Sequence, residues 1–359
     1  MSESPPSQSP ETGVPPAGEN AERKPSGKKR FYTSAIGIFI IVLLSLIAIE
    51  VATRSLYPEQ ALTVPDAYTF YRIRPDLKDY RRSNPFRVQS SVSTNEDGFR
   101  AAGVHRKKNP GTYRVLCIGD SITFGNYDIG NEETYPYYLQ EFLKRKHPSR
   151  DFEVINGGCP GYTCLQGMEL LRRRGLAYSP DLLIIGYLHH EMVKVPVRDS
   201  DRMNIPGPVK LTRSVLYGSA FYRKLKQGVQ EVEEDPEAGR KEGSVSRVSL
   251  EEYKATMEKF IKIAEDRGVK LIFLNLPTAR SVVSKEDKDY REALNDLASG
   301  KKIPLFDAYT YFCSQYEKKR IPLFTVDSIH PNAYGNMVMA QGIADFIDKK
   351  GFLNEGEKK

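Results

Sequence analysis

Short apolar runs alternate with segments of helical periodicity through the C-terminal two thirds of this 359-residue chain. Each run suits a buried strand, and each segment that follows repeats its apolar residues every three or four positions. The expected strands are residues 114–118, 152–155, 181–187, 269–274 and 303–306, and the expected helices are residues 135–146, 165–176, 250–267, 290–298 and 333–350. Strands that alternate with helices form βαβ units. The order therefore predicts an α/β fold with a parallel sheet covered by helices on both faces.

The N-terminal part precedes this pattern and has a different composition. Residues 1–30 are rich in Pro, Ser, Glu and Gly and hold few apolar side chains, which predicts a disordered tail. Residues 31–53 follow, and their uncharged apolar stretch is long enough to cross a bilayer as one helix. Because basic residues occupy positions 28–30, the positive-inside rule predicts a cytoplasmic N-terminus and an exported C-terminal domain. A cleaved signal peptide is the alternative, although no Ala-x-Ala pattern follows the stretch.

The rest of the chain divides into a lead-in, a main domain and a tail. Residues 54–112 carry many Tyr, Arg and Pro residues, and we expect an extended lead-in that packs on the core. Residues 113–350 form the main domain, and residues 351–359 form a tail. Within the domain, residues 192–248 interrupt the alternation and are expected to form an insertion, with a polar, mobile loop at residues 231–246.

Charge and cysteine content argue against two classes of protein. The net charge is +7, but no dense Lys/Arg run is interleaved with aromatic residues, so the sequence indicates no nucleic-acid partner. The four cysteines form no Cys-x-x-Cys pair, and a structural zinc site is not expected. Cys159 and Cys164 are five positions apart. The sequence leaves open whether they form a disulfide or remain buried thiols, because small spacing does not ensure bridging geometry.

Two short segments more than two hundred residues apart carry the residue types of nucleophilic catalysis. Ser121 follows the first expected strand, and Asp327 and His330 lie three positions apart before the last expected helix. A serine hydroxyl is a poor nucleophile until a base takes its proton, and the base needs a carboxylate to orient it. Thr123 stands where a Gly-x-Ser-x-Gly elbow would have its final glycine, which argues against an α/β-hydrolase. Taken alone, each segment also fits an ordinary turn with a capping aspartate.

Two further candidates follow the second and third expected strands. Gly161 ends a glycine-rich run, and its backbone can approach a substrate closely and offer an N–H group to an oxyanion. His190 can add a side-chain donor. Because the carboxyl ends of parallel strands meet at one edge of a sheet, Ser121, Gly161 and His190 are expected to converge there. A metal site at His190 is not expected, because Lys194 stands where the zinc-protease helix has its second histidine.

Together, these segments resemble the motif blocks of the SGNH, or GDSL, hydrolases, a family of esterases and lipases. The Gly-Asp-Ser block is at 119–121, the glycine block at 156–161 and the Asp-x-x-His block at 327–330, in the family's order. The resemblance covers about two thirds of the chain. It implies a flavodoxin-like three-layer α/β sandwich with a parallel sheet, preceded here by one transmembrane helix.

The resemblance also implies a role for each candidate residue. Ser121 takes the role of the nucleophile, His330 that of the base and Asp327 that of the orienting carboxylate. The backbone N–H groups of Ser121 and Gly161 take the role of oxyanion donors. One block departs from the family, because His190 stands where the family usually has an oxyanion-binding asparagine. An imidazole N–H would then replace the asparagine amide.

A segment of the lead-in strengthens the membrane interpretation. Residues 95–100 resemble a segment that precedes the core in membrane-anchored bacterial members of the family. This implies a single-pass protein of the bacterial inner membrane, with its catalytic domain outside the cytoplasm. We expect Arg100, at the end of this segment, to have a structural role such as pairing with a carboxylate.

The resulting hypothesis is a membrane-anchored serine esterase. It would hydrolyse acyl esters, in particular acetyl esters, on envelope glycans or lipids through an acyl-serine intermediate, with no cofactor and no metal. Two alternatives stay open at this point. One is an O-acyltransferase that passes the acyl group to an extracellular polysaccharide, and the other is a non-catalytic glycan-binding domain.

Overall fold

The computed structural model of the chain describes residues 27–56, 61–81, 91–101, 103–125, 129–225, 244–279 and 283–353, with side chains from residue 34 onward. The chain divides into two compact units, Met1–Leu56 and Tyr57–Lys359. The first unit holds helix α1, and the second holds the strands of the described chain.

Helix α1, Gly27–Leu56, contains the apolar stretch expected at residues 31–53. Its part Ser34–Leu56 has 23 residues and a mean hydropathy of 2.8, so it is long and apolar enough to cross a membrane. A signal sequence near an N-terminus can have the same length and composition. The basic residues 28–30 were expected in a disordered tail but lie in this helix, because Lys and Arg are good helix formers. The rest of the expected tail, residues 1–26, lies outside the described residues.

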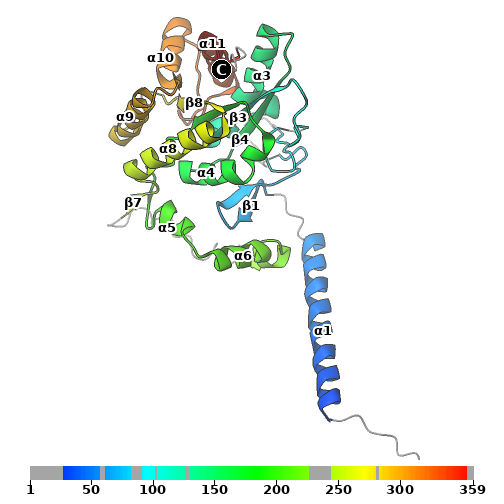
Figure 1. Cartoon of the computed structure of the whole chain (residues 1–359). Coiled ribbons are helices and arrows are strands. Elements are labelled where there is room, and N and C mark those ends of the chain that lie inside the picture. The colour runs from blue at the N-terminus through cyan, green and yellow to red at the C-terminus, as the bar shows by residue number, and fades with distance from the viewer. Residues whose placement is uncertain are drawn as a thin grey trace, which may run out of the picture. The chain divides into compact units, whose positions relative to one another are not determined.

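The second unit is built on a five-stranded parallel sheet, seen between two layers of helices in Figure 1. Its strands are β3 (Tyr113–Gly119), β4 (Phe152–Gly158), β5 (Leu182–Gly186), β8 (Lys270–Asn275) and β9 (Leu305–Asp307). The spatial order is β4-β3-β5-β8-β9, which is 2-1-3-4-5 when the five strands are counted along the chain. This is the flavodoxin-like order, and the predicted fold class is confirmed.

Helices cover both faces of this sheet. Helices α3 (Tyr135–Lys146), α10 (Ala308–Lys319) and α11 (Ala333–Lys349) form one layer, and α4 (Cys164–Arg173), α8 (Leu250–Arg267) and α9 (Lys285–Gly300) form the other. Because both faces are covered, the central strands are buried on both sides. All five residues of β5 are buried, which accounts for its continuous apolar sequence.

Helix α8 shows how the sequence sets these boundaries. It begins after Ser249, whose hydroxyl accepts the N–H of Glu252, while the Glu252 carboxylate accepts the N–H of Ser249. It ends at Gly268, whose φ of +63° suits glycine. The buried side chains recur every three or four positions and are Tyr253, Thr256, Met257, Phe260, Ile261 and Ala264. The helix therefore lies with one apolar face on the sheet, as its periodicity predicts.

The ends of strands β4 and β5, which lie at the site, differ from the sequence expectation. The expected strand 152–155 continues as β4 to Gly158, because Gly157 and Gly158 pair with Ile118 and Gly119 of β3. A side chain at Gly158 would come within 2.1 Å of the Phe124 nitrogen, so glycine is needed for this approach. Strand β5 ends at Gly186 rather than at residue 187. The two histidines that follow therefore lie in a turn beyond the strand.

The lead-in and the insertion add small elements around this core. They are the antiparallel strands β1 (Thr63–Asp66) and β2 (Phe70–Ile73), the short strands β6 (Lys194–Val195) and β7 (Val245–Ser246), and helices α5 (Asp199–Met203) and α6 (Gly207–Leu216). The lead-in places Leu62, Ile73 and Phe99 in the hydrophobic core. The sequence pattern did not predict helix α10, because few of its residues are buried and apolar periodicity is weak there. Most of the loop expected at residues 231–246 lies outside the described residues.

Candidate active site

Ser121 opens a four-residue helix, α2 (Ser121–Phe124), directly beyond the end of strand β3. The Asp120 carboxylate accepts the N–H of Ile122 at 2.9 Å and caps this short helix. Thr123 stands close to Gly119, where a side chain would come within 2.1 Å of the Thr123 Oγ1. The strand-to-helix transition therefore depends on glycine, and it holds the Ser121 hydroxyl at the carboxyl edge of the sheet.

Ser121, His330 and Asp327 form one continuous hydrogen-bonded chain. The Ser121 Oγ lies 2.7 Å from the His330 Nε2, and the His330 Nδ1 lies 2.7 Å from the Asp327 Oδ2. With the imidazole proton on Nδ1 and directed to the carboxylate, Nε2 is the acceptor for the serine proton. The geometry is that of a serine–histidine–aspartate triad, assembled from segments 209 positions apart in sequence.

The loop that carries Asp327 is held by its own short-range hydrogen bonds. The Asp327 Oδ1 accepts the N–H groups of Ile329 and His330, both at 2.9 Å, and the Thr325 hydroxyl at 2.8 Å. Partial burial raises the pKa of Asp327, but the backbone N–H groups of His330 and Ile329, with the His330 imidazole and the Thr325 hydroxyl, lower it below its usual range. Asp327 is therefore a carboxylate at neutral pH. Ser328, at the loop tip, has a φ of +61°.

Asn332 closes this loop and begins helix α11. Its side-chain oxygen accepts the N–H of Gly335 at 2.8 Å and caps the helix. Its amide nitrogen donates to the carbonyls of Pro322 and Phe324 at 3.0 and 3.2 Å. The same residue thus ties the start of the helix to the extended segment that leads into the loop.

Gly161 lies in a tight turn beyond strand β4. The N–H of Tyr162 donates to the carbonyl of Cys159 at 3.1 Å, and Gly161 has a φ of +80°. With Pro160 in the second position, this is the pattern of a type II turn, which favours glycine in the third position. We call residues 159–162 the oxyanion turn. Within the part of the chain that the structure describes, the N–H groups of Ser121 and Gly161 have no protein acceptor, so both are free to bind an oxyanion.

Two side chains from distant segments hold the oxyanion turn. The Tyr71 hydroxyl, from β2, donates to the Pro160 carbonyl at 2.7 Å. The Arg247 guanidinium, from the end of the insertion, donates to the Gly161 carbonyl at 2.8 Å. The peptide group that carries the Pro160 carbonyl also carries the N–H of Gly161. A hydrogen bond accepted by that carbonyl polarises the peptide and makes its N–H a stronger donor.

Arg247 is itself fixed by a buried network. It forms an ion pair with Asp199, 2.7 Å between the nearest nitrogen and oxygen, and Asp199 has no solvent exposure. The Thr163 hydroxyl donates to Asp199 at 3.0 Å, and Arg247 also donates to the Gln166 amide oxygen at 3.0 Å. The sequence reasoning missed Arg247 and Tyr71, because each is a single residue without a motif around it.

The two histidines beyond β5 have different surroundings. His189 lies 3.2 Å from the Thr278 hydroxyl through its Nε2. No hydrogen bond of the His190 ring is among those of the described residues. Burial is the main cause that lowers the pKa of His190 to about 4, and the positive charge of Arg247 lowers it further. His190 is therefore neutral at pH 7, with one N–H available as a donor.

Arg100 is buried and binds carbonyl groups rather than a carboxylate. Its guanidinium donates to the carbonyls of Phe124, Gly125 and Ile129, and to the side-chain oxygen of Asn131. Burial lowers the pKa of Arg100 to about 9. The structural role expected for Arg100 agrees with these contacts, but the expected carboxylate partner was wrong. The last carbonyl groups of a helix have no donor within the helix, so the carbonyls at the end of α2 and just after it need one from another segment.

A fully buried acid, Glu191, lies behind the oxyanion turn. Its Oε1 accepts the N–H of Cys164 at 2.8 Å, at the start of helix α4. Burial raises the pKa of Glu191 to about 8, so the carboxyl is mostly protonated at neutral pH. Cys159 and Cys164 are both buried free thiols, which answers the question of a disulfide between them. Among the described residues, no group of three or more His, Cys, Asp and Glu side chains is placed to hold a metal ion.

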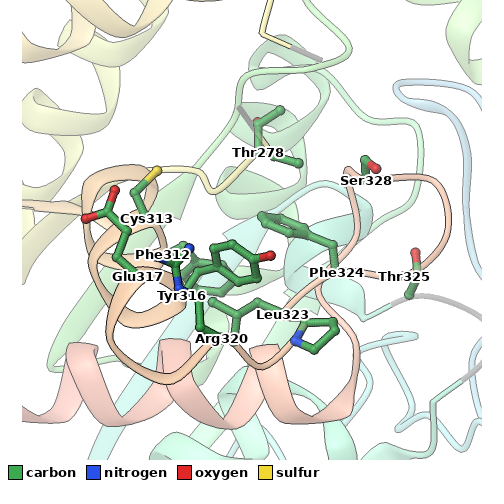
Figure 2. A pocket seen from close by; sticks show the side chains of 12 residues that line it. Thr278, Phe312, Cys313, Tyr316, Glu317, Arg320, Leu323, Phe324, Thr325 and Ser328 are labelled. Carbon is green, nitrogen blue, oxygen red and sulfur yellow. The ribbon is translucent and has the colours of Figure 1, made fainter. Parts of the chain in front are cut away.

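A pocket of about 770 Å³ lies beside residues 325–330, the segment that carries Asp327 and His330 and that we call the triad loop. Figure 2 shows Thr325 and Ser328 of the loop on one side of it, and aromatic side chains of α10 on the other. The labelled lining residues are Thr278, Phe312, Cys313, Tyr316, Glu317, Arg320, Leu323, Phe324, Thr325 and Ser328. This pocket was not predicted from the sequence, because helix α10 was not foreseen.

Comparison with solved structures finds similar folds. A lipase/acylhydrolase from Enterococcus faecalis is 16% identical over 66% of this chain and 96% of its own, with a TM-score of 0.44. An acetylxylan esterase from Geobacillus stearothermophilus is 17% identical over 66% and 94%, also with a TM-score of 0.44. An α/β hydrolase enzyme from the metagenome of Lake Arreo, Spain, is 18% identical over 68% and 97%, with the same score.

No protein-family model and no curated protein matches the chain. The solved structures are remote in sequence, and the chemistry of the site follows from its own residues. The sheet order and the sequence of blocks along its carboxyl edge are those implied by the resemblance to the SGNH hydrolases.

Proposed function

We propose that this protein is a serine ester hydrolase anchored in the bacterial inner membrane by α1. Its substrates are acyl esters, in particular acetyl esters, of envelope glycans or lipids. The observation that carries the proposal is the pair of 2.7 Å contacts that join Ser121 to His330 and His330 to Asp327. Such a chain activates a hydroxyl group as a nucleophile without a metal or a cofactor.

The first half of the reaction forms an acyl-serine. The Ser121 proton passes to the His330 Nε2 as Oγ forms a bond with the ester carbonyl carbon. The carbonyl oxygen becomes an oxyanion, which the N–H groups of Ser121 and Gly161 stabilise, with the neutral His190 as a third donor. The bond to the alcohol oxygen then breaks, and His330 returns the proton to the leaving alcohol. Asp327 remains a carboxylate and stabilises the imidazolium that forms between these steps.

The second half repeats these steps with water. His330 takes a proton from a water molecule, whose oxygen attacks the acyl carbon. The same donors hold the second oxyanion, and the bond to the Ser121 Oγ breaks as His330 returns the proton to that oxygen. The products are the free acid and the restored serine hydroxyl.

The pocket beside the triad loop supports a substrate in which the alcohol part of the ester is bulky. Its volume of about 770 Å³ lies in the range of small-molecule sites. It combines the aromatic rings of Phe312, Tyr316 and Phe324 with the charged side chain of Arg320. Aromatic faces with a few polar groups suit the apolar face and hydroxyl groups of a sugar ring. We therefore assign the alcohol part of the substrate to this pocket.

The test is ester hydrolysis by the full-length chain in detergent, with p-nitrophenyl esters of increasing acyl length. Ser121→Ala is expected to lower kcat by about 10⁴–10⁶-fold, as for removal of other triad nucleophiles. Ser314→Ala is the matched control, because Ser314 lies in α10 and donates to a carbonyl of its own helix. Full activity of Ser121→Ala would contradict the proposal. Faster acyl transfer to an added sugar than to water would instead identify an acyltransferase.

A further inference from the structure

Helix α6 of the insertion, Gly207–Leu216, exposes its apolar side chains. The exposed fractions are 42% for Val209, 66% for Leu211, 70% for Val215 and 37% for Leu216. At about 100° per residue these four positions share one side of the helix. The chain that follows continues the pattern, since Phe221 and Leu225 are 43% and 58% exposed.

The opposite side of α6 is polar and faces the protein. Lys210, Arg213 and Tyr217 recur at intervals of three and four residues, and all three are partly buried. The Lys210 Nζ lies 5.7 Å from the centre of the Tyr68 ring. A surface helix of a globular protein normally packs its apolar side inward and its polar side outward. Helix α6 does the reverse, so its apolar side is available to a further apolar surface.

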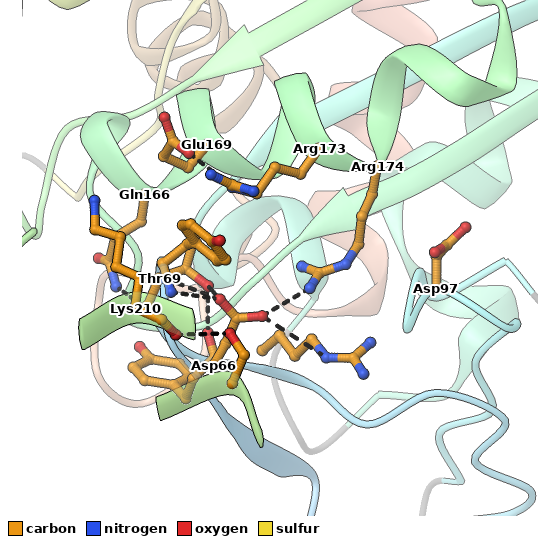
Figure 3. A network of polar contacts seen from close by, with 12 residues as sticks. Asp66, Thr69, Asp97, Gln166, Glu169, Arg173, Arg174 and Lys210 are labelled. Carbon is orange, nitrogen blue, oxygen red and sulfur yellow. Dashed lines mark hydrogen bonds and ion pairs between the residues drawn. The ribbon is translucent and has the colours of Figure 1, made fainter. Parts of the chain in front are cut away.

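The contacts of α6 place it beside the β1–β2 hairpin. Figure 3 shows Lys210 next to Asp66 and Thr69 of this hairpin. Asp66 accepts the N–H groups of Tyr68 and Thr69, at 2.9 and 3.0 Å, and forms an ion pair with Arg174 at 2.7 Å. The Arg173 guanidinium covers the Tyr68 ring, 3.2 Å from its centre. The hairpin that supports α6 is thus fixed to helix α4 and the main domain.

The length of the chain argues for a membrane as the covering surface. Only residues 57–60 separate the candidate span, Ser34–Leu56, from Ala61. Five fully extended residue steps cover about 18 Å, so the covalent reach from the end of α1 to the hairpin is short. If α1 crosses a bilayer, as the proposed function requires, the start of the hairpin lies within about this distance of the membrane-spanning segment, which gives α6 a nearby lipid surface to contact.

The side chains of this region suit a lipid interface. Interfacial helices combine an apolar face with Lys and Arg on the other face, and they bury the apolar face at the boundary of headgroups and acyl chains. Lys210 and Arg213 lie on the polar face of α6, and Arg223 follows in the next segment. Tyr217 and Tyr222, whose ring centres are 5.9 Å apart, are the residue type that collects at membrane interfaces.

We propose that residues 207–225 form a second membrane contact, with the apolar side of α6 buried in the lipid interface. This inference rests on the anchoring role of α1 but not on the esterase activity. A second copy of the chain is the alternative occupant of the same face.

The absence of Trp from the chain allows a direct test. Leu211→Trp and Val215→Trp each introduce a single reporter on the exposed face. Each full-length variant is reconstituted in vesicles of anionic phospholipid, with and without brominated acyl chains, which quench nearby Trp fluorescence. Tyr316→Trp is the control, because Tyr316 lies on α10 and is 47% exposed. A blue shift and bromine quenching are expected for residues 211 and 215, and neither is expected for residue 316.

Three results would overturn the proposal. A blue-shifted but unquenched reporter whose shift disappears on dilution into excess lipid would identify a second copy. Emission at both positions like that of the residue 316 control would show an uncovered face. Failure of the full-length chain to float with vesicles would show that α1 does not anchor the protein in a membrane. Ester hydrolysis by the Leu211→Trp and Val215→Trp variants in detergent reports separately on the proposed function, because α6 contributes no residue to the triad or to the lining of the pocket.

Discussion

The two halves of the candidate site are held in opposite ways. The triad loop is held mainly from within, because Asp327 accepts hydrogen bonds from residues two and three positions away. The oxyanion turn is held from outside, by Tyr71 from 89 positions before Pro160 and by Arg247 from 86 positions after Gly161. The first arrangement can be encoded in a short motif. The second depends on the folding of the whole unit.

This difference separates residues that take part in the proposed reaction from residues that position the oxyanion turn. A change within the triad loop removes a proton acceptor or its orienting partner, so it acts on catalysis directly. A change in Tyr71 or Arg247 leaves the triad in place. It acts on the Gly161 N–H, whose position depends on both side chains and whose polarity depends on Tyr71. Four substitutions, in descending order of expected effect, test this division.

Asp327→Asn is expected to have the largest of these effects. An amide keeps the shape of the side chain, and its oxygen takes the place that accepts the N–H groups of Ile329 and His330. Its NH₂ group then faces the His330 Nδ1, which favours the wrong tautomer of the imidazole. The analogous change in a serine protease lowers kcat by about 10⁴-fold, and a fall of similar size is expected here. The measurement is kcat for a p-nitrophenyl ester, with the melting temperature as a control for folding. A fall of less than about tenfold would show that Asp327 does not orient His330.

Gly161→Ala is expected to lower kcat by about 10²–10³-fold, the usual cost of one lost oxyanion donor. Alanine disfavours the φ of +80°, and its methyl carbon would come within 2.5 Å of the Tyr71 hydroxyl. Tyr71→Phe removes that clash but also a hydrogen bond to the turn, so it is measured alone as the reference. The loss caused by Gly161→Ala should be smaller in the Tyr71→Phe background than in the wild type. Equal losses in the two backgrounds would show that backbone strain, rather than contact with Tyr71, dominates.

Arg247→Met is expected to lower kcat by about 10-fold, with little change in KM. The loss of a hydrogen bond from a charged donor costs about 1.5 kcal/mol or more, and Asp199 is left buried without its partner. Arg247→Met/Asp199→Asn removes that orphaned charge and separates the stability effect from the catalytic one. Arg202→Met is the matched control, because the Arg202 side chain is 51% exposed and lies 3.9 Å from Asp199. Equal effects of Arg202→Met and Arg247→Met on kcat would refute the positioning role.

Glu191→Gln is expected to change the pH dependence of stability rather than activity. Burial raises the pKa of Glu191 to about 8 in the folded state, so the wild-type acid contributes most to stability below its unfolded pKa of 4.5. That contribution is lost as pH rises from 4.5 to about 8, because only the unfolded chain ionises freely in this range. The free energy of unfolding of the variant, measured with urea, should therefore gain on the wild type between these two pH values. A constant difference would show that Glu191 is not protonated in the folded protein.

The contrast between contacts within a short segment and contacts between distant segments also explains what could be predicted from the sequence. The strands and most of the helices follow from local patterns. The pairing of Ser121 with His330 was expected from their residue types and from the resemblance of the motif blocks to the SGNH hydrolases. Arg247 and Tyr71 escaped prediction, because a single Arg or Tyr in an irregular segment carries no periodicity or spacing. Helix α10 escaped because only Ala308 and Phe312 are buried, too few to produce an amphipathic pattern.

The errors at the site have physical causes as well. The end of β4 was placed too early, because Gly157 and Gly158 are typical of a turn, although close packing against α2 is what requires Gly158. Arg100 was expected to pair with a carboxylate, since buried arginines usually do, but the carbonyl groups of Phe124, Gly125 and Ile129 satisfy it instead. In both cases the deciding contact lies with a segment that local patterns do not identify.

The chain order of the site has a consequence for synthesis. Tyr71, Arg100, Ser121 and Gly161 all emerge from the ribosome before His330, which is residue 330 of 359. Throughout most of synthesis, the nascent chain therefore carries a serine hydroxyl with no base beside it. Under the proposed function, that serine is an ordinary alcohol until the loop before α11 brings His330 to it, so the hydroxyl becomes a nucleophile only after a late part of the chain has folded.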